Sequence, residues 1–302
     1  MATRPSSPKQ LPQQAGRPRR GGEDGARAAG QAALSQSLER GLMILSSFSE
    51  IRPVLGIADL ARSVDLNKST TYRYVATLAR LGYVQQDPET KKYSLGPRVI
   101  DLGFAALNSM ELTRVAARYI QALADEIGYS ASMAVLDGPD IVYIDRRRSQ
   151  RDGGLALDLN LQVGSRLPAY CTAMGKVLLA YREPAVLREL LDRTDFARRT
   201  AKTITVREQL MTALARIRQV GIATSDEEFS AGVRSVAAPV RDRAGIVIAA
   251  VDAPVHMTIW NASMDQILLR LEGPLRRATG EISARLGHVP SRLATESLSS
   301  FE

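Results

Sequence analysis

Apolar residues recur at helical spacing in three successive segments near the start of the chain. Ser37 is placed to cap the first helix, whose apolar positions are Leu38, Leu42, Leu45 and Phe48. A second helix follows Pro53 and carries Ile57, Leu60, Ala61 and Val64. A turn over 65–67 precedes a third helix, with an apolar face of Thr71, Tyr74, Val75, Leu78 and Leu81. Its opposite face is polar and holds Ser69, Thr70, Arg73, Thr77 and Arg80.

A hairpin follows the third helix. Gly82 ends that helix, and residues 83–85 and 92–95 flank the turn-forming sequence Asp87-Pro88-Glu89-Thr90. Two helices, a short turn, a third helix and a hairpin form the order of a winged helix-turn-helix. We therefore predict such a domain over 35–96.

The hydrophobic pattern beyond residue 96 interleaves helices and strands. A linker over 97–110 is largely helical and is a candidate dimerisation element. Further helices are predicted at 111–127, 172–181, 184–191, 206–220 and 263–286, and strands at 131–136, 141–145, 222–225, 233–241 and 246–253, with an irregular or strand segment at 153–164. These elements predict a mixed sheet covered by helices over 111–287. The expected fold class is α+β, with a second, mixed α/β domain.

Both ends of the chain differ in composition from these domains. Residues 1–34 are rich in Pro, Gln, Gly, Ala and Arg, and we expect a disordered basic tail there. Residues 288–302 are expected to form a flexible tail. The net charge of +8 is concentrated at the front, with +4 in 1–34 and +2 in 35–95. A polyanion would therefore meet the N-terminal part of the protein.

Several protein classes are disfavoured by the sequence. No apolar run reaches the roughly 18 residues that a membrane helix needs, and the first 22 residues lack the apolar core of a signal peptide. A single Cys171 cannot form an internal disulfide. We expect a cytoplasmic protein without a membrane partner, and the spacing of Cys and His indicates no metal site and no cofactor.

The third helix offers the chemistry that a DNA groove requires. Arg73 presents a guanidinium that can pair with guanine edges, and the hydroxyls of Ser69, Thr70 and Thr77 can bond bases or phosphates. The candidate phosphate contacts are Lys68, Lys91 and Lys92. The alternative is a winged helix that binds protein and leaves this face in solvent.

Signals for catalysis are weak in the second domain. Gly175-Lys176 lacks the remaining residues of a phosphate-binding loop, and neither His256 nor His288 is placed by the sequence beside Cys171. Asp226-Glu227-Glu228 is typical of a charged loop. By contrast, residues 167–175 lead into a helix whose N-terminus favours a small anion. The strand residues Ser225, Val233 and Ser235 either complete a pocket there or simply pack the sheet against its helices.

Two long strings, taken in order with the N-terminal motifs, resemble the IclR family of bacterial transcription regulators between about Ser37 and Leu286. The N-terminal motifs are Ser37-Leu38-Glu39-Arg40-Gly41-Leu42, Asn67-Lys68-Ser69-Thr70-Thr71-Tyr72-Arg73 and Leu81-Gly82-Tyr83. The two strings are Gly164-Ser165-Arg166-Leu167-Pro168-Ala169-Tyr170-Cys171-Thr172-Ala173-Met174-Gly175-Lys176 and Asp226-Glu227-Glu228-Phe229 through Gly232-Val233-Arg234-Ser235-Val236-Ala237-Ala238-Pro239.

This resemblance implies a winged helix-turn-helix followed by a sensor-like effector-binding domain, assembled as dimers or dimers of dimers. It is strongest to the branch of PcaR, PcaU and PobR, which implies an aromatic acid or a ring-cleavage product such as protocatechuate as effector. The DNA-binding residues implied or indicated are Arg40, Lys68, Ser69, Thr70, Tyr72, Arg73, Thr77, Lys91 and Lys92. The effector-binding residues are Arg146, Leu167, Tyr170, Cys171, Thr172, Ala173, Met174, Ser225, Val233, Ser235 and Asp252.

Asp252 departs from the family, which commonly has Ser or Asn at this position. A carboxylate would repel an acidic effector unless it is protonated or bonded to the effector's hydroxyls. Arg146 is a candidate to offset this repulsion by pairing with the effector carboxylate. The alternative is that Arg146, Arg147 and Arg148 form a solvated strand edge.

We therefore expect a regulator without catalytic activity that binds a double-stranded operator, a small organic acid and a second copy of itself, with RNA polymerase as a further candidate partner. The alternatives are a family member that responds to a non-aromatic carbon source, an enzyme with a regulatory winged helix, and a nonspecific DNA-binding protein. The sequence leaves open the polarity of regulation, the operator, and whether the basic tail contacts DNA.

Overall fold

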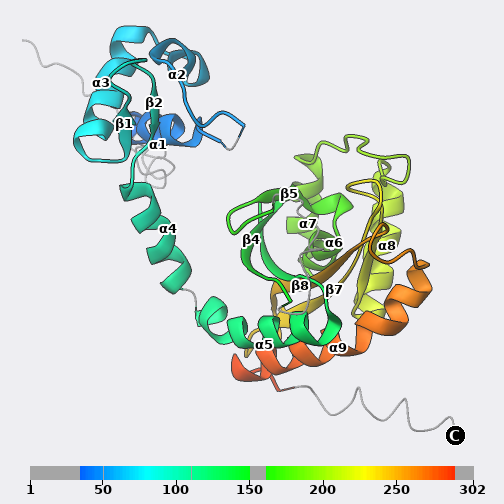
Figure 1. Ribbon diagram of the computed structural model, residues 1–302. Coiled ribbons are helices and arrows are strands. Elements are labelled where there is room, and N and C mark those ends of the chain that lie inside the picture. Colours follow the sequence, from blue (N-terminus) through cyan, green and yellow to red (C-terminus); the bar gives the residue numbers. More distant parts are fainter. Residues whose placement is uncertain (1–34, 50, 110, 150–160, 290–302) are drawn as a thin grey trace, which may run out of the picture. The chain divides into compact units, whose positions relative to one another are not determined.

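The computed structural model describes residues 35–49, 51–109, 111–149 and 161–289. They belong to two units that divide between Asp101 and Leu102, and each unit is considered by itself (Figure 1). The predicted tail over 1–34, most of the tail over 288–302 and most of the segment 153–164 lie outside the described residues.

The N-terminal unit is built from short helices and one hairpin. Its elements are α1 (Gln36–Ser46), α2 (Ile57–Ser63), α3 (Lys68–Arg80), β1 (Val84–Gln86), β2 (Tyr93–Leu95) and the start of α4 (Arg98–Ser109). β1 pairs antiparallel with β2, and Gln85 lies opposite Ser94. A small core that includes Ile44, Leu60 and Val75 holds these elements together. Among the described residues this is the order predicted for a winged helix-turn-helix.

The first helix differs from its prediction in its cap and in its buried face. Ser35, not Ser37, is the N-cap, and its side chain accepts a hydrogen bond from the Leu38 backbone N–H. Leu38 is 64% exposed and Leu42 is 55% exposed, whereas Ile44 is completely buried. The apolar spacing predicted the helix correctly. Its contacts with α2 and α3 bury Ile44 and leave Leu38 and Leu42 exposed.

The C-terminal unit contains one sheet and helices on both of its faces. The helices are α5 (Glu111–Ile127), α6 (Ala173–Ala180), α7 (Pro184–Asp192), α8 (Arg207–Val220) and α9 (Met264–Arg285), with a 3-10 turn η1 (Ala169–Cys171). The strands are β3 (Ala131–Asp137), β4 (Asp140–Arg147), β5 (Arg166–Pro168), β6 (Ala223–Asp226), β7 (Val233–Arg241) and β8 (Val247–His256).

The strands form a six-stranded sheet in the order β5-β4-β3-β8-β7-β6. Each of its strand pairs is antiparallel. The prediction of a mixed sheet was therefore wrong for the described strands, although helices and strands do alternate along the chain. Hairpins join β3 to β4 and β7 to β8, so neighbouring strands reverse direction without the crossover helix that parallel pairing needs.

Two cores lie on opposite faces of this sheet. α5 and α9 cover one face, where their apolar side chains meet Met133, Val236 and Val251. α6, α7 and α8 cover the other face, around Tyr143, Ala237 and Ala250. Alternate residues of a strand point to opposite faces, so the even-numbered β8 residues from Ala250 to Pro254 point toward α6.

The segment before α6 is more ordered than the loop predicted over 167–175. β5 and η1 precede α6, and Thr172 caps the helix by accepting a hydrogen bond from the Gly175 N–H. A side chain at Gly175 could not be accommodated, since a Cβ there would lie 2.2 Å from the Ala169 carbonyl oxygen. This close approach fixes the start of α6 over the sheet. Within the described part of the chain, no helix is long and apolar enough to cross a membrane.

Candidate nucleic-acid interface and ligand cavity

The polar face of α3 is open to solvent as predicted from its sequence. Lys68, Ser69, Tyr72, Arg73 and Thr77 are all exposed, and Thr70 is half-buried at the first turn. Asn67 caps the helix by accepting a hydrogen bond from the Thr70 N–H. The first turn of α3 carries no acidic residue.

The α3 side chains differ in the hydrogen-bonding capacity that remains available to a ligand. The Thr77 hydroxyl donates to the Arg73 carbonyl oxygen at 2.9 Å, so it presents only acceptor capacity outward. Thr71, one position from Thr70, is completely buried and donates to the Asn67 carbonyl oxygen. Arg73 therefore supplies the most versatile donor group on this surface.

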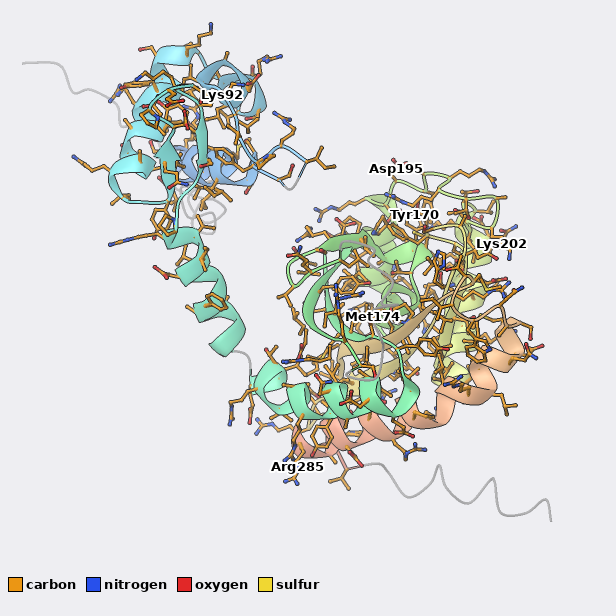
Figure 2. The ribbon with its side chains drawn as sticks, in the orientation of Figure 1. Lys92, Tyr170, Met174, Asp195, Lys202 and Arg285 are labelled. Atoms are coloured by element: carbon orange, nitrogen blue, oxygen red, sulfur yellow. The ribbon has the colours of Figure 1, made fainter. Side chains whose placement is uncertain are left out.

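The hairpin carries two exposed lysines beside a tight turn. Asp87 accepts hydrogen bonds from the backbone N–H groups of Glu89 and Thr90, and these bonds lower the pKa of its carboxyl. Lys91 has a backbone φ of 57°, and Lys92 follows it on the surface (Figure 2). Both ammonium groups are available to phosphates.

Arg40 occupies a different position from the other predicted DNA contacts. It lies half-buried on α1 and hydrogen-bonds the Tyr74 hydroxyl of α3. The bond with Ser37 and this bond with Arg40 lower the pKa of Tyr74. Arg40 is thus positioned to brace α3, and a role in contacting DNA stays a prediction.

The C-terminal unit encloses a small cavity between the sheet and the start of α6. It is lined by Tyr143, Leu161, Leu167, Thr172, Ser225, Phe229, Val233, Ser235, Asp252 and Pro254. Its volume is about 30 Å³, which corresponds to one or two water molecules. A ring-sized ligand would enter only if side chains such as Phe229 moved aside.

Six predicted effector residues line this cavity, namely Leu167, Thr172, Ser225, Val233, Ser235 and Asp252. Four others, Tyr170, Cys171, Ala173 and Met174, are buried in the core instead. Figure 2 places Tyr170 and Met174 within the C-terminal unit, and the Tyr170 hydroxyl donates to the Ala197 carbonyl oxygen at 2.5 Å. None of these four lines the cavity, and their role in effector binding stays a prediction. Burial raises the pKa of the Cys171 thiol to about 11, so it is a poor nucleophile.

The sequence interpretation missed four cavity residues: Tyr143, Leu161, Phe229 and Pro254. Pro254 could have been found from its alternation with Asp252 on the same strand. Tyr143 could not, because a register irregularity between Met133 and Ala134 shifts the pairing of β3 with β4.

A row of polar residues crosses the three central strands beside the cavity. Asp252 on β8 lies opposite Ser132 on β3, which in turn lies opposite Arg146 on β4. Directly opposed residues share one face of a sheet. Arg146 Nη1 donates to the Ser132 hydroxyl at 3.4 Å, and Ser132 hydrogen-bonds the Asp252 carboxyl. Arg146 therefore lies on the same sheet face as Asp252 but outside the cavity lining, and its positive charge compensates the charge of Asp252.

Asp252 is buried, with only 5% of its surface exposed. Burial raises the pKa of its carboxyl to about 7, against the opposing effects of Arg146 and Ser132. Burial and the neighbouring Asp252 also raise the pKa of the Tyr143 hydroxyl well above its usual value. Within the described residues, Asp252 Oδ1 has no hydrogen-bond partner.

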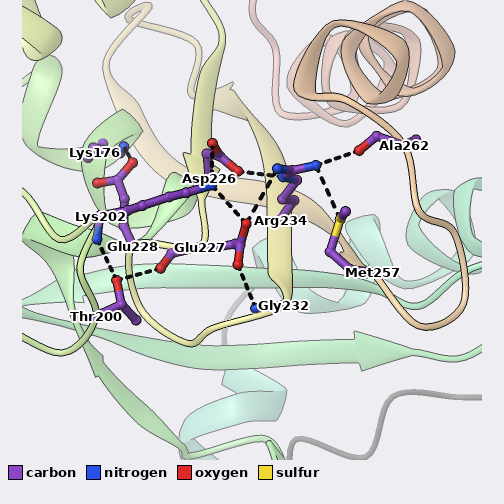
Figure 3. A network of polar contacts seen from close by, with 10 residues as sticks. All are labelled: Lys176, Thr200, Lys202, Asp226, Glu227, Glu228, Gly232, Arg234, Met257 and Ala262. Carbon is purple, nitrogen blue, oxygen red and sulfur yellow. Dashed lines mark hydrogen bonds and ion pairs between the residues drawn. The ribbon is translucent and has the colours of Figure 1, made fainter.

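A polar network holds the segment between β6 and β7 at one side of the cavity (Figure 3). Arg234 bonds Asp226 and Glu227, and it also donates to the Ala262 carbonyl oxygen. Lys202 bonds the same two carboxylates, at 3.1 Å to Asp226 and 2.8 Å to Glu227. The segment predicted as a charged loop is therefore a turn fixed by ion pairs, and it carries the cavity residue Phe229.

The third acidic residue of that segment is buried. Glu228 forms an ion pair with Lys176 of α6, and both side chains are nearly inaccessible (Figure 3). Burial raises the pKa of the Glu228 carboxyl, while Lys176 opposes that shift. Thr203 also donates its hydroxyl hydrogen to the Glu228 carbonyl oxygen. The pair connects α6 to the β6–β7 turn. It therefore links the two elements that carry the cavity residues Thr172 and Phe229.

Both units match one protein family. Residues 37–88 match the IclR helix-turn-helix domain, and residues 104–284 match the bacterial transcriptional regulator IclR C-terminal domain. The chain belongs to the IclR family. The fold, an N-terminal helix-turn-helix unit followed by a mixed α/β unit, is that of IclR regulators, and the family and its relatives are transcriptional regulators rather than enzymes.

Relatives within the IclR family differ in what they regulate. The chain is 38% identical over 221 residues to the Pca regulon regulatory protein of Pseudomonas putida, covering 73% of this chain and 74% of the relative. It is 35% identical over 253 residues to the transcriptional regulator XynR of Escherichia coli, covering 84% and 98%.

A solved IclR homologue from Microbacterium hydrocarbonoxydans, complexed with 4-hydroxybenzoate, is also similar. It is 26% identical with a TM-score of 0.69, and the match covers 83% of this chain and 98% of the homologue.

Proposed function

We propose that this IclR-family DNA-binding regulator responds to a small aromatic acid, such as protocatechuate or another intermediate of aromatic catabolism. The observation that carries this proposal is the enclosed cavity of the C-terminal unit. It combines apolar walls from Leu167 and Phe229 with the hydroxyls of Ser225 and Ser235. Apolar walls with a few placed polar groups are typical of a site for a small organic ligand.

Two relatives support the aromatic class. One is the Pca regulon regulatory protein, and the other is the homologue with 4-hydroxybenzoate bound. The acid would act by favouring one arrangement of the paired winged helices. It can change operator affinity only by as much as its own affinity differs between the arrangements.

We further propose that the operator is read by α3 and the hairpin, with Arg73 contacting base edges and Lys68, Lys91 and Lys92 contacting phosphates. The exposure of these side chains and the absence of acidic residues from the first turn of α3 support this assignment. The basic tail over 1–34 stays a candidate for additional DNA contact. We place the protein in the cytoplasm, where bacterial operators and RNA polymerase are found.

Self-association is the remaining part of the proposal. α4 exposes Ile100 and Phe104, which lie one helical turn apart and are each 59% exposed. Large exposed apolar side chains at helical spacing are suited to a second helix of the same kind. A dimer would present two copies of α3 to an operator with two half-sites.

A thermal-shift screen of the full chain tests the effector class. Ligand at about 100 times its Kd stabilises the native state by about 2.7 kcal/mol, which corresponds to a rise in Tm of at least about 5 °C. We expect such a rise with a benzoate derivative. A rise with sugar acids alone would favour the second candidate, a regulator of a non-aromatic carbon source, which the similarity to XynR and to KdgR of Escherichia coli keeps open.

A further inference from the structure

The cavity contains one buried acceptor whose bonding capacity is not used. Asp252 comes from the middle of the sheet, yet its side chain lines the cavity together with Tyr143, Ser225 and Ser235. Within the part of the chain that the structure describes, Asp252 Oδ1 lies buried without a hydrogen-bond partner. A buried carboxylate oxygen left in this state costs free energy, so a partner that donates a hydrogen bond is favoured.

The surrounding residues set what that partner must be. Ser132 accepts a hydrogen bond from Arg146 and has a single hydrogen, which it gives to the Asp252 carboxyl. It therefore has no donor left for Oδ1. The hydroxyl hydrogen of Ser225 is also used, because it is donated to the Cys171 carbonyl oxygen at 3.2 Å. No described residue donates a hydrogen bond to Oδ1, so a ligand in the cavity can supply that donor.

When Asp252 is ionised, a carboxylate of the ligand is the wrong group for this position. Two carboxylates in contact within a low-dielectric cavity repel each other, and neither can donate a hydrogen bond. A ligand hydroxyl has the opposite property, because it donates one hydrogen and carries no charge. Arg146, across Ser132, compensates the charge on Asp252 without itself lining the cavity.

We propose that Asp252 is a specificity-determining residue, which selects effectors with a hydroxyl group by accepting that group's hydrogen bond at Oδ1. The inference rests on the proposed function, since it names the substrate class of the same cavity: a hydroxy acid whose hydroxyl faces Asp252 and whose carboxylate points away from it. Sites that hydrogen-bond a ligand hydroxyl discriminate strongly against the analogue without it, because the buried protein group is then left unpaired.

Calorimetric titration of the full chain with matched acid pairs tests this inference. The pairs are benzoate with 3-hydroxy-, 4-hydroxy- and 3,4-dihydroxybenzoate, succinate with malate, and hexanoate with gluconate. Each acid is titrated into the wild type and Asp252→Ala. Asp195→Ala is the matched control, because it removes an exposed carboxylate of the same unit that does not line the cavity and leaves Asp252 in place. The melting temperature of each variant reports its folding.

We expect the wild type to bind the hydroxylated member of one pair at least about tenfold more tightly than the other member. Asp252→Ala should bring that ratio close to one, whereas Asp195→Ala should leave it unchanged. Asp252→Asn retains an acceptor oxygen and should keep part of the preference for the hydroxylated acid. This second variant keeps the test decisive if Asp252→Ala does not fold.

The remaining outcomes overturn the inference. If an acid binds the wild type without preference for a hydroxyl, or if Asp252→Ala keeps the full ratio, the assignment of Asp252 fails while the effector-binding function stands. If no acid in any pair binds, both the inference and the proposed organic-acid effector fail.

Discussion

Asp252 links stability to pH at the scale of a single residue. Its native pKa of about 7 lies above the ordinary aspartate value of 3.8 because the carboxyl is buried. The native state therefore holds a proton that the unfolded state releases between these two values. Stability should fall as pH rises from about 4 to about 7, and then level off. Arg146 and Tyr143 are the charged or titratable neighbours of this carboxyl.

We predict that Asp252→Asn removes most of this pH dependence. The variant should be more stable than the wild type at pH 8 by a few kcal/mol, and nearly equal to it at pH 4. Urea unfolding of both proteins at pH 4, 6 and 8 measures the difference. A constant difference at all three pH values would show that Asp252 titrates normally in the folded protein.

Arg73 is the residue on which specific DNA recognition depends in this account. Removing a bidentate base contact costs about 1–3 kcal/mol, so Arg73→Ala should weaken binding to a preferred sequence by about tenfold or more. The preferred sequence can be obtained by selecting random-sequence DNA on the wild-type protein. Acid binding should be unchanged in this variant.

Arg188→Ala is the matched control for Arg73→Ala. Arg188 is an exposed arginine of α7 in the other unit, so its loss changes the net charge equally. Fluorescence anisotropy at fixed salt compares the variants. Equal affinities of Arg73→Ala and Arg188→Ala would remove Arg73 from the DNA contacts.

At the scale of elements, the Lys176–Glu228 ion pair joins α6 to the β6–β7 turn. Removing one member of a buried pair leaves an uncompensated charge. Lys176→Met should therefore destabilise the protein by about 3 kcal/mol, and more at pH 8 than at pH 5, because Glu228 can take up a proton at low pH. Adding Glu228→Leu should recover most of the loss. Chemical unfolding of the three proteins measures this, and a Lys176→Met variant as stable as the wild type would contradict it.

The elements also show what the sequence could and could not predict. Periodicity placed α3, α5, β7 and α9 to within a residue or two, since their apolar positions repeat over many residues. β5 is only three residues long and was interpreted as a loop. For α1, spacing found the helix and placed Leu45 and Phe48 in the core, but it did not reveal that Leu38 and Leu42 are exposed.

The cavity was predictable in part. The strand residues Ser225, Val233 and Ser235 were identified from the sequence, and the structure places them at the cavity. Phe229 was not, because its position depends on the network of Lys202 and Arg234 that fixes the turn. No local pattern specifies such long-range contacts.

At the scale of the whole molecule, the proposed regulation involves two copies of the chain that act together. Phe104→Glu would place a charge in the proposed α4 contact, where burial without a partner is unfavourable. We predict that the dimer dissociates at protein concentrations at least tenfold higher than for the wild type. Analytical ultracentrifugation measures this, with Leu269→Glu on α9 as the control for an exposed apolar residue elsewhere. Unchanged sedimentation of Phe104→Glu would place the dimer contact outside this face.

The central claim is that acid binding in the C-terminal unit controls DNA binding by the N-terminal unit. The most direct measurement is the affinity for the selected DNA sequence with and without a saturating acid that raises the melting temperature. Coupling free energies of about 1–3 kcal/mol are typical of such systems. We therefore predict at least a fivefold change in Kd, which is lost in Asp252→Ala at the same acid concentration. An acid that binds tightly and leaves the DNA affinity unchanged would contradict the account.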